Sequence, residues 1–497
     1  MVQLLAEHAT LTFLAWSQYN KLFDLQLKVE HSLGDGLYCT DCEGRIITKE
    51  MTEQLEKAMR DILTGSTPIE LTSLSQNELI NHFTEMKMVD KVGVLKTWQD
   101  EMVPCVKVGD CIDYLIEPIS TDKERLKIFE IRPYNNGLVL RFPSLSSPLS
   151  IKEWNDPKTL LSMFTEYREW AKVIGVDNVS KLNELIFKRK IDDIKWVAEG
   201  LHDNKLASIA DHLSKNFERK RIITIAGPSS SNKTTFAKRL AIALRVNGYH
   251  SVVMEMDDFY RDRDDIPFGP DGLQDFEAIS ALNIPVLVQR IHALIQGETV
   301  PSRKFIFSSG KGVDNSQKML TLPPNSFLIM EGIHGLNPEL LNEIGRDKVT
   351  PIYVSALTPI SVDNNHRFPT SDLRLIRRMI RDYRYRGYSP RKTLGRWTSV
   401  RKGEEKNIFP HQANAELFFN SALVYELPVL SIFGKALLSE ATVPEAGEDP
   451  DSKEAQLISQ EARRLLGLLN LFYPVSVEVV PHISCIREFV GGSDLKY

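Results

Sequence analysis

Short apolar runs alternate with a helical pattern from residue 221 onward. RIITIAG, SVVMEM, SFLIMEG and TPIYVSA are brief runs rich in β-branched and other apolar residues, and they predict buried strands. KTTFAKRLAIALRVNG follows the first run and predicts a helix. Strands that alternate with helices predict an α/β fold, in which a parallel sheet is flanked by helices on both faces.

Other patterns divide the rest of the chain. Residues 1–150 mix short apolar runs with turns and end in a Pro/Ser cluster, which is typical of a domain boundary, so we expect a separate α+β domain there. Residues 151–220 carry amphipathic spacing and predict a helical connector. We expect the parallel-sheet domain to cover 221–440. Residues 441–497 predict an acidic linker, a helix and a C-terminal tail.

Composition excludes several classes of protein. The chain has 497 residues with 42% hydrophobic content and a net charge of −5, so no overall field favours nucleic acid or an anionic membrane. No apolar run reaches the roughly 18 residues of a spanning helix. The first residues lack a basic segment typical of a signal peptide, and we expect a cytoplasmic protein. The five cysteines are odd in number and sparse, which favours reduced thiols.

The stretch GPSSSNKTT, directly after the first predicted strand, has the pattern of a phosphate-binding loop (P-loop). In such loops, backbone N–H groups surround the phosphates, a lysine neutralises the β/γ oxygens, and a Ser/Thr hydroxyl ligates Mg²⁺. Lys233 and Thr234 occupy those two positions. The predicted nucleotide-binding residues are Gly227, Pro228, Ser229, Ser230, Ser231, Asn232, Lys233, Thr234 and Thr235. The sequence therefore predicts a P-loop NTPase sheet that binds ATP and Mg²⁺.

Asn232 departs from this pattern, because a glycine usually precedes the lysine. Asparagine is one of the few other residues that tolerates a positive φ, so the loop can still form. We expect Asn232→Gly to retain ATP binding with equal or tighter affinity.

Acidic residues follow two other predicted strands. Asp257 and Asp258 close SVVMEM, and a hydroxyl kinase needs a carboxylate that accepts the proton and helps to hold Mg²⁺. Asp257 is the first candidate and Asp258 the second. Glu331 ends SFLIME, in the manner of a Walker-B acid. Because ligands bind at the carboxyl ends of parallel strands, these groups converge with the loop. We predict Thr234, Glu331 and Asp257 as the metal-associated residues.

A basic helix is predicted further along the chain. Arg374, Arg377, Arg378 and Arg381 have the i, i+3, i+4, i+7 spacing of one helix face. Such a face can be simply solvated or can bind nucleic acid. Arginines that close from a lid would instead stabilise the charge that develops during phosphoryl transfer.

Together these motifs resemble the uridine kinase/phosphoribulokinase family. The segment Asp372–Gly387 is similar to the family's lid helix, which implies catalytic roles for Arg377, Arg378 and Arg381. MDDFY and LIMEGIH resemble family segments that imply a catalytic Asp257 and a Mg-associated Glu331. Lys233 of the loop, which would hold the β/γ-phosphates, is also predicted as a catalytic residue. LQDFEA resembles the substrate segment and implies that Asp275 lies near ribose hydroxyls. The predicted substrate-binding residues are Asp258, Tyr260, Asp275, Arg303 and Lys304.

The chain also resembles the longer uridine kinase-like proteins that have a threonyl-tRNA-synthetase-like N-terminal region. VEHSLGDGLYC, WTSVRKGEEKN and the tail REFVGG are similar to that group. Arg303 and Lys304 stand where uridine kinases place tyrosine and aspartate, which favours an acidic or phosphorylated acceptor over uridine. The H-x-x-x-H pair of the synthetase editing site is absent, so no editing activity is assigned.

These features predict an ATP- and Mg-dependent kinase that phosphorylates a hydroxyl of a small molecule, a nucleoside such as uridine or cytidine or a related metabolite. The alternative is a nucleotide-binding regulatory or RNA-associated protein with little catalysis. The predicted partners are ATP and the acceptor, without a membrane. RNA contact by the N-terminal region and homo-oligomer formation stay open.

Overall fold

The protein forms two compact units in a computed structural model. The structure describes residues 2–144, 147–156, 158–268, 274, 275, 277–306 and 308–496. The first unit comprises Met1–Lys195, Thr358–Thr398 and Val424–Val479, and the second comprises Trp196–Leu357, Ser399–Leu423 and Val480–Tyr497. These units divide the chain differently from the boundaries expected from sequence, because the region 221–440 contributes to both.

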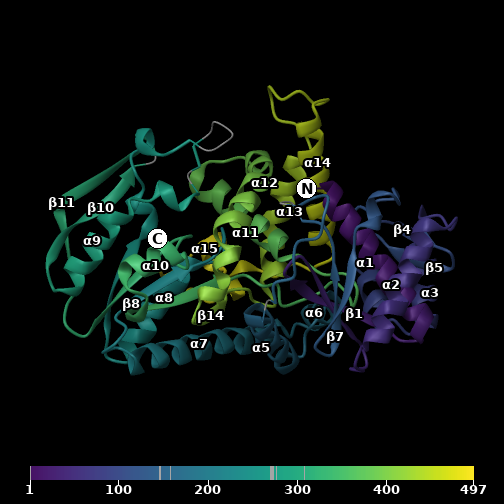
Figure 1. Cartoon of the computed structure of the whole chain (residues 1–497). Coiled ribbons are helices and arrows are strands. Elements are labelled where there is room, and N and C mark those ends of the chain that lie inside the picture. Colours follow the sequence, from purple (N-terminus) through teal and green to yellow (C-terminus); the bar gives the residue numbers. More distant parts are fainter. Residues whose placement is uncertain are drawn as a thin grey trace. The chain divides into compact units, whose positions relative to one another are not determined.

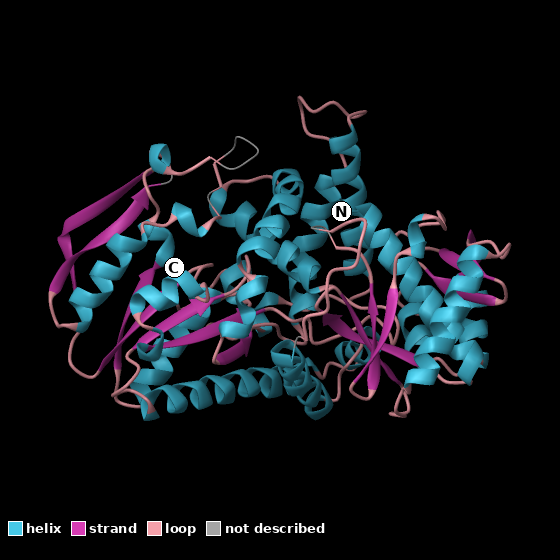
Figure 2. Cartoon of the chain, viewed as in Figure 1, coloured by secondary structure: helices cyan, strands magenta, loops and turns pink. Residues whose placement is uncertain are grey.

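A five-stranded parallel sheet forms the centre of the second unit (Figure 2). Its strands are β8 (Ile222–Ala226), β9 (His250–Glu255), β12 (Ser326–Glu331), β13 (Val349–Ser355) and β14 (Leu417–Asn420). The order is β14-β13-β8-β12-β9, and every pairing is parallel. The predicted α/β class with a parallel sheet is therefore confirmed, and the four strands expected from their apolar runs are present.

Helices cover both faces of this sheet because its strands are apolar on both sides. The helices are α7 (Ile191–Lys215), α8 (Lys233–Val246), α9 (Ile284–Ile295) and α10 (Pro338–Ile344). Ile223 and Ile225 of β8 pack with α8 and with the part of α7 around Leu213. Figure 1 shows α8 next to β8, with α7 running along the same side. Ile222 of β8 packs on the other face, with α9 and α10. Each face therefore has its own apolar core.

Smaller elements complete the second unit. An antiparallel hairpin joins β10 (Thr299–Ile306) and β11 (Lys311–Thr321), and α9 contacts β10. The 3₁₀ helix η2 (Met256–Phe259) follows β9 directly. The remaining short helices are η3 (Arg263–Asp265), η4 (Ile279–Ala281), η5 (Arg346–Lys348), η6 (Phe409–Asn414) and α15 (Arg487–Val490). The hairpin had no counterpart among the elements predicted from the sequence.

The N-terminal part of the first unit is α+β, as expected. One antiparallel sheet has the order β1-β2-β7-β6, and a second has the order β3-β4-β5. The strands are β1 (Leu27–Leu33), β2 (Gly36–Asp41), β3 (Glu70–Ser75), β4 (Met102–Val108), β5 (Cys111–Tyr114), β6 (Glu130–Tyr134) and β7 (Gly137–Arg141). The helices are α1 (Val2–Phe23), α2 (Lys49–Thr64), α3 (Gln76–Glu85), α4 (Val89–Leu95) and η1 (Arg125–Lys127).

The rest of the first unit is helical. Its helices are α5 (Lys158–Ile174), α6 (Val179–Phe187), α11 (Thr370–Arg386), α13 (Glu426–Ala441), α14 (Lys453–Asn470) and η7 (Val477–Val479). Helix α12 (Pro390–Asn407) begins in the first unit and ends in the second. Across the described ranges, no helix is both long enough and apolar enough to span a bilayer.

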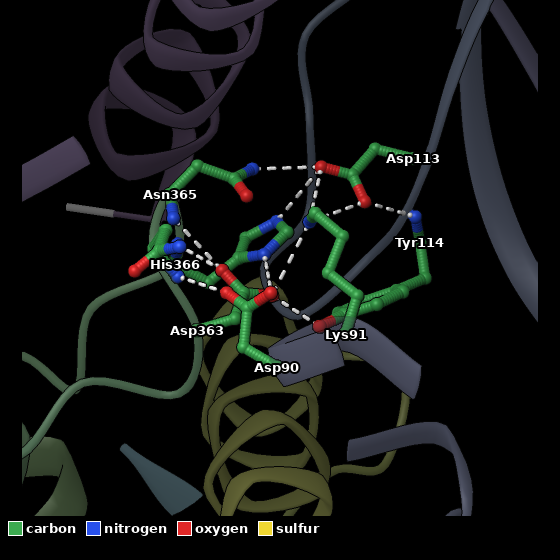
Figure 3. A network of polar contacts seen from close by, with 8 residues as sticks. Asp90, Lys91, Asp113, Tyr114, Asp363, Asn365 and His366 are labelled. Carbon is green, nitrogen blue, oxygen red and sulfur yellow. Dashed lines mark hydrogen bonds and ion pairs between the residues drawn. The ribbon is translucent and has the colours of Figure 1, made fainter. Parts of the chain in front are cut away.

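A buried polar network joins the N-terminal elements to the segment that precedes α11 (Figure 3). Lys91 of α4 donates to Asp113 of β5 at 2.8 Å and to Asp363 at 3.3 Å. His366 Nδ1 lies 2.8 Å from the Asp363 carboxylate, and Asn365 donates to Asp113 at 2.7 Å. Removing charges from water is costly, so such groups are stable inside a protein only when they are paired. The network therefore fixes residues 363–366 against α4 and β5.

Candidate active site

The predicted phosphate loop connects the end of β8 to the start of α8. Gly227 has no room for a side chain, because an added Cβ would lie 2.0 Å from the Val354 carbonyl oxygen of β13. Ser230 and Asn232 have φ values of 59° and 68°, in the left-handed region. Asparagine tolerates this region better than most residues, so Asn232 provides the backbone geometry that a glycine usually supplies. The substitution does not prevent the loop from forming.

The loop is arranged to bind an anion. Its amides precede the N-terminus of α8, where the helix dipole favours negative charge. Lys233 Nζ lies 3.0 Å from the Gly227 carbonyl oxygen and 3.3 Å from that of Pro228, so the ammonium lies over the loop. The arrangement suits the phosphates of a nucleotide.

Glu404 is a residue of this site that the sequence did not reveal. It lies in the last turn of α12 and is 1% exposed. Its Oε1 accepts a hydrogen bond from the Ser229 amide at 3.0 Å, and its Oε2 pairs with Arg401 at 3.0 Å. One backbone N–H donor of the loop is therefore already hydrogen-bonded to a carboxylate. No spacing signal links Glu404 to the loop, because 175 residues separate it from Ser229.

Thr234 and Glu331 come together beside the loop, as predicted. Thr234 Oγ1 donates to Glu331 Oε1 at 2.6 Å. Glu331 is 8% exposed, and burial raises the pKa of its carboxyl to about 7, although the Lys233 ammonium and the Thr234 hydroxyl act to lower it. The nearby Asp257 charge raises it further. Mg²⁺ prefers oxygen ligands and retains several waters, so one hydroxyl and one or two carboxylates fit its chemistry.

The two predicted aspartates lie in η2, at the carboxyl end of β9. Asp257 is exposed, whereas Asp258 is half-buried. Asp258 lies 3.1 Å from Lys304 Nζ and accepts from the Phe305 amide at 3.3 Å. Burial raises the pKa of the Asp258 carboxyl, and the hydrogen bond from Lys304 opposes that effect. Asp257 is exposed, and its charge acts on the Glu331 carboxyl, so the two carboxylates lie near each other.

Arg303 and Lys304 point in different directions, because neighbouring residues of a strand face opposite sides. Lys304 pairs with Asp258 and with Glu255, at 3.1 and 3.5 Å. Arg303 instead pairs with Asp314 of β11 at 3.3 Å. The structure therefore brings Lys304, but not Arg303, to the acidic turn that carries the predicted base.

The other predicted substrate residues also belong to the second unit. Tyr260 is buried and packs edge-on against Phe305, with ring centroids 5.6 Å apart. Asp275 forms an ion pair with Lys406 of α12 at 2.7 Å. His334, which was not among the predicted site residues, is 1% exposed, and burial lowers the pKa of its imidazole to about 4. The Asp275 charge acts on this imidazole, so the two residues lie near each other.

The predicted lid arginines lie on α11, in the first unit. Arg377 is fully buried and forms two hydrogen bonds with Glu426 of α13, at 2.5 and 2.6 Å. Arg378 and Arg381 lie 3.3 and 3.1 Å from Asp382. These contacts belong to the packing of the first unit, so the structure places Arg377 in a structural ion pair. The transition-state role of the three arginines stays a prediction.

Comparison with known proteins locates the similarity in the same part of the chain. The family model described as "PRK: Phosphoribulokinase / Uridine kinase family" matches residues 222–427. A protein named uridine kinase from Deinococcus deserti is 29% identical over 35% of this chain and 75% of its own length. A uridine kinase from Halalkalibacterium halodurans is 27% identical over 37% of this chain and 77% of its own.

Two solved structures also match. One is titled a putative fructose transport system kinase from Silicibacter, with 17% identity, a TM-score of 0.30, and coverage of 43% of this chain and 98% of that one. The other is titled a possible uridine kinase from Bacillus stearothermophilus, with 16% identity, a TM-score of 0.28, and coverage of 43% and 99%. The family match leaves the N-terminal region outside, so its synthetase-like character stays a prediction. Residues 222–427 thus match the Phosphoribulokinase / Uridine kinase family.

Proposed function

We propose that the protein transfers a phosphoryl group from Mg·ATP to a hydroxyl of a small molecule. The observation that carries this proposal is the contact between Thr234 and Glu331 beside the loop, at 2.6 Å. A hydroxyl from the loop and an acid from a neighbouring strand are the two protein groups that P-loop enzymes use around Mg²⁺. The match of residues 222–427 to a kinase family supports the same function.

Each residue of the site has a separate role in the proposed reaction. The loop amides and Lys233 would bind the β- and γ-phosphates. Thr234, Glu331 and Asp257 would hold Mg²⁺, which supplies charge neutralisation at the phosphate oxygens when it is bound. Asp257 would accept the proton of the acceptor hydroxyl as its oxygen attacks the γ-phosphorus, and ADP would leave. Phosphoryl transfer depends mainly on positioning and electrostatics, which these residues provide.

The acceptor that we propose first is a nucleoside, because the matched relatives have the printed name uridine kinase and the family model that covers residues 222–427 includes uridine kinases. Lys304 favours a second candidate, an acidic or phosphorylated acceptor, since its ammonium lies beside the acidic turn. A panel of nucleosides, sugar phosphates and hydroxy acids would separate the two. Fast uridine phosphorylation without preference for anions would exclude the second candidate.

The kinase proposal is tested by steady-state ATP consumption with this panel. Lys233→Ala should weaken nucleotide binding, and Asp257→Asn should retain binding but lose turnover. Wild-type protein that binds ATP, with no acceptor raising turnover above these variants, would contradict the proposal. That result would favour the alternative, a nucleotide-binding regulatory or RNA-associated protein. RNA binding would show a steep salt dependence, because phosphate contacts release counterions.

Further predictions concern parts of the chain outside the loop. Arg378→Ala and Arg381→Ala should lower kcat if these side chains stabilise transferred charge, and leave it unchanged if they serve only the packing of α11. A synthetase-like N-terminal region, self-association and a cytoplasmic location also stay predictions.

A further inference from the structure

The Asn232 side chain makes contacts that a glycine could not make. Asn232 is 1% exposed, and its Nδ2 donates to the Cys485 carbonyl oxygen and to Glu488 Oε2, both at 2.9 Å. These acceptors are 253 and 256 residues away along the chain. Both belong to the second unit, as the loop does. Asn232 therefore combines a left-handed backbone with a specific side-chain connection.

Glu488 makes a second contact at the same place. Its Oε2 also accepts a hydrogen bond from Thr235 Oγ1, in the first turn of α8. One carboxylate oxygen thus connects the last loop residue to the helix that follows. A negative charge next to a helix N-terminus is stabilised by the helix dipole, and hydrogen bonds to a charged acceptor are stronger than neutral ones. The position favours a persistent contact.

The C-terminal segment that supplies Glu488 is itself well anchored. Cys485 is fully buried in the core formed by α7 and α8, and Arg239 of α8 donates to its Sγ at 3.4 Å. Lys238 of α8 donates to the Lys496 carbonyl oxygen. Arg487 donates to the Val480 carbonyl oxygen and to that of Gly491, at 3.2 Å each, and so closes the segment on itself. The segment is therefore a rigid support for the Glu488 carboxylate.

We propose that Glu488 is a positioning residue of the phosphate loop, and that the C-terminal segment 480–496 is an integral part of the nucleotide site. By holding the Asn232 amide and the Thr235 hydroxyl, Glu488 fixes the backbone on both sides of Lys233 and Thr234. Asn232 is then a specialised member of the loop and not a weakened glycine. The expected effect of Asn232→Gly reverses: the change toward the usual motif weakens nucleotide binding. This inference rests on the proposed nucleotide site.

The test compares the full-length protein with Asn232→Gly, Glu488→Ala, Glu488→Gln and the double variant Asn232→Gly/Glu488→Ala. The control is Asp494→Ala, which removes an exposed carboxylate from the same segment. The probe is Mg²⁺ with a non-hydrolysable ATP analogue, measured by calorimetry. A second readout, hydrogen exchange of the backbone amides of residues 229–235, is taken without nucleotide.

We expect Asn232→Gly and Glu488→Ala each to weaken binding of the analogue about 3- to 10-fold, since each removes two hydrogen bonds. The double variant should lose less affinity than the sum of the two single losses, because the Asn232–Glu488 hydrogen bond is removed by both changes, whereas the Cys485 and Thr235 contacts are each removed by only one. Glu488→Gln keeps an acceptor oxygen but loses the charge, so its affinity should lie between that of wild type and that of Glu488→Ala. Loop amides should exchange faster in the first two variants, and KM for ATP should rise more than kcat falls.

Three results would overturn the inference. The affinity losses of the two single variants could add in the double variant, the loop amides could exchange at the wild-type rate, or Asp494→Ala could lose as much affinity as Glu488→Ala. A fall in kcat at constant KM would do the same, because it would indicate fewer folded molecules and not a displaced loop. The two proposals fail separately. Wild-type protein that binds no Mg·ATP would refute the nucleotide site, and the exchange of residues 229–235 would then decide by itself whether Glu488 holds the loop.

Discussion

Replacing Glu331 by glutamine should make the nucleotide-free protein more stable at pH 8, although it removes a predicted metal ligand. The carboxyl has an ordinary pKa of 4.5, and burial raises it to about 7 in the folded protein. Between these two values, the folded state holds a proton that the unfolded state has released. Stability therefore falls as the pH rises from about 4.5 to about 7, and the full loss is present above pH 7.

The size of the stability change follows from the shift of the Glu331 pKa. Each tenfold change in proton affinity corresponds to about 1.4 kcal/mol, so a rise from 4.5 to about 7 corresponds to about 3 kcal/mol. Glutamine carries no charge and retains an oxygen that can accept from Thr234. We expect Glu331→Gln to stabilise the second unit by up to about 3 kcal/mol at pH 8 and by almost nothing at pH 4.5. For a domain of this size, that corresponds to a Tm higher by roughly 6–12 °C at pH 8.

The assay is thermal and urea unfolding at both pH values, with chelator present and nucleotide absent. Glu255→Gln is the matched control, because Glu255 pairs in register with Glu331 at the end of the neighbouring strand but is exposed. The control should change stability much less than Glu331→Gln at pH 8, because the Glu255 charge is the weakest of the causes that raise the pKa of Glu331. The reasoning would be refuted by a Glu331→Gln protein that is no more stable than wild type at pH 8, or by an equal gain at both pH values. Loss of Mg-dependent ATP binding in the same variant would support its metal role.

Three further changes have expected outcomes. Lys91→Met should destabilise the first unit by about 3–5 kcal/mol in urea unfolding, because Asp113 would remain buried without its cation; a loss below 1 kcal/mol would contradict the reading of the network. Glu404→Gln should tighten Mg·ATP binding several-fold in calorimetry, since it removes the negative charge that lies next to the Ser229 amide. Weaker binding would instead indicate that Glu404 assists nucleotide binding. Gly227→Ala should abolish ATP binding, because its Cβ would overlap the Val354 carbonyl; near-normal affinity would show that the loop can relax.

The local pattern of the sequence was sufficient for the parallel sheet and for the loop. Three of its strands, β8, β12 and β13, are short apolar runs buried along their whole length, so composition identifies them without knowledge of their neighbours. β9 was predicted although it is more exposed, and the four-residue β14 was not predicted. Topology then brings strand ends together, which is why the sequence alone was sufficient to pair Thr234 with Glu331. The β10–β11 hairpin was missed because β11 is almost entirely exposed and has little apolar signal.

Only the tertiary structure determines which partners the polar side chains outside the predicted motifs contact. In the sequence, Arg377 belongs to a charged helix face of the kind that is often exposed to solvent, but in the structure it is buried against Glu426. The sequence of one helix does not reveal which element packs on it. Glu404 reaches the loop from 175 residues away, and Glu488 from 256. Asn232 shows both contributions. Its tolerance of a left-handed backbone follows from its chemistry alone, but its connection to Glu488 depends on where the fold places the end of the chain.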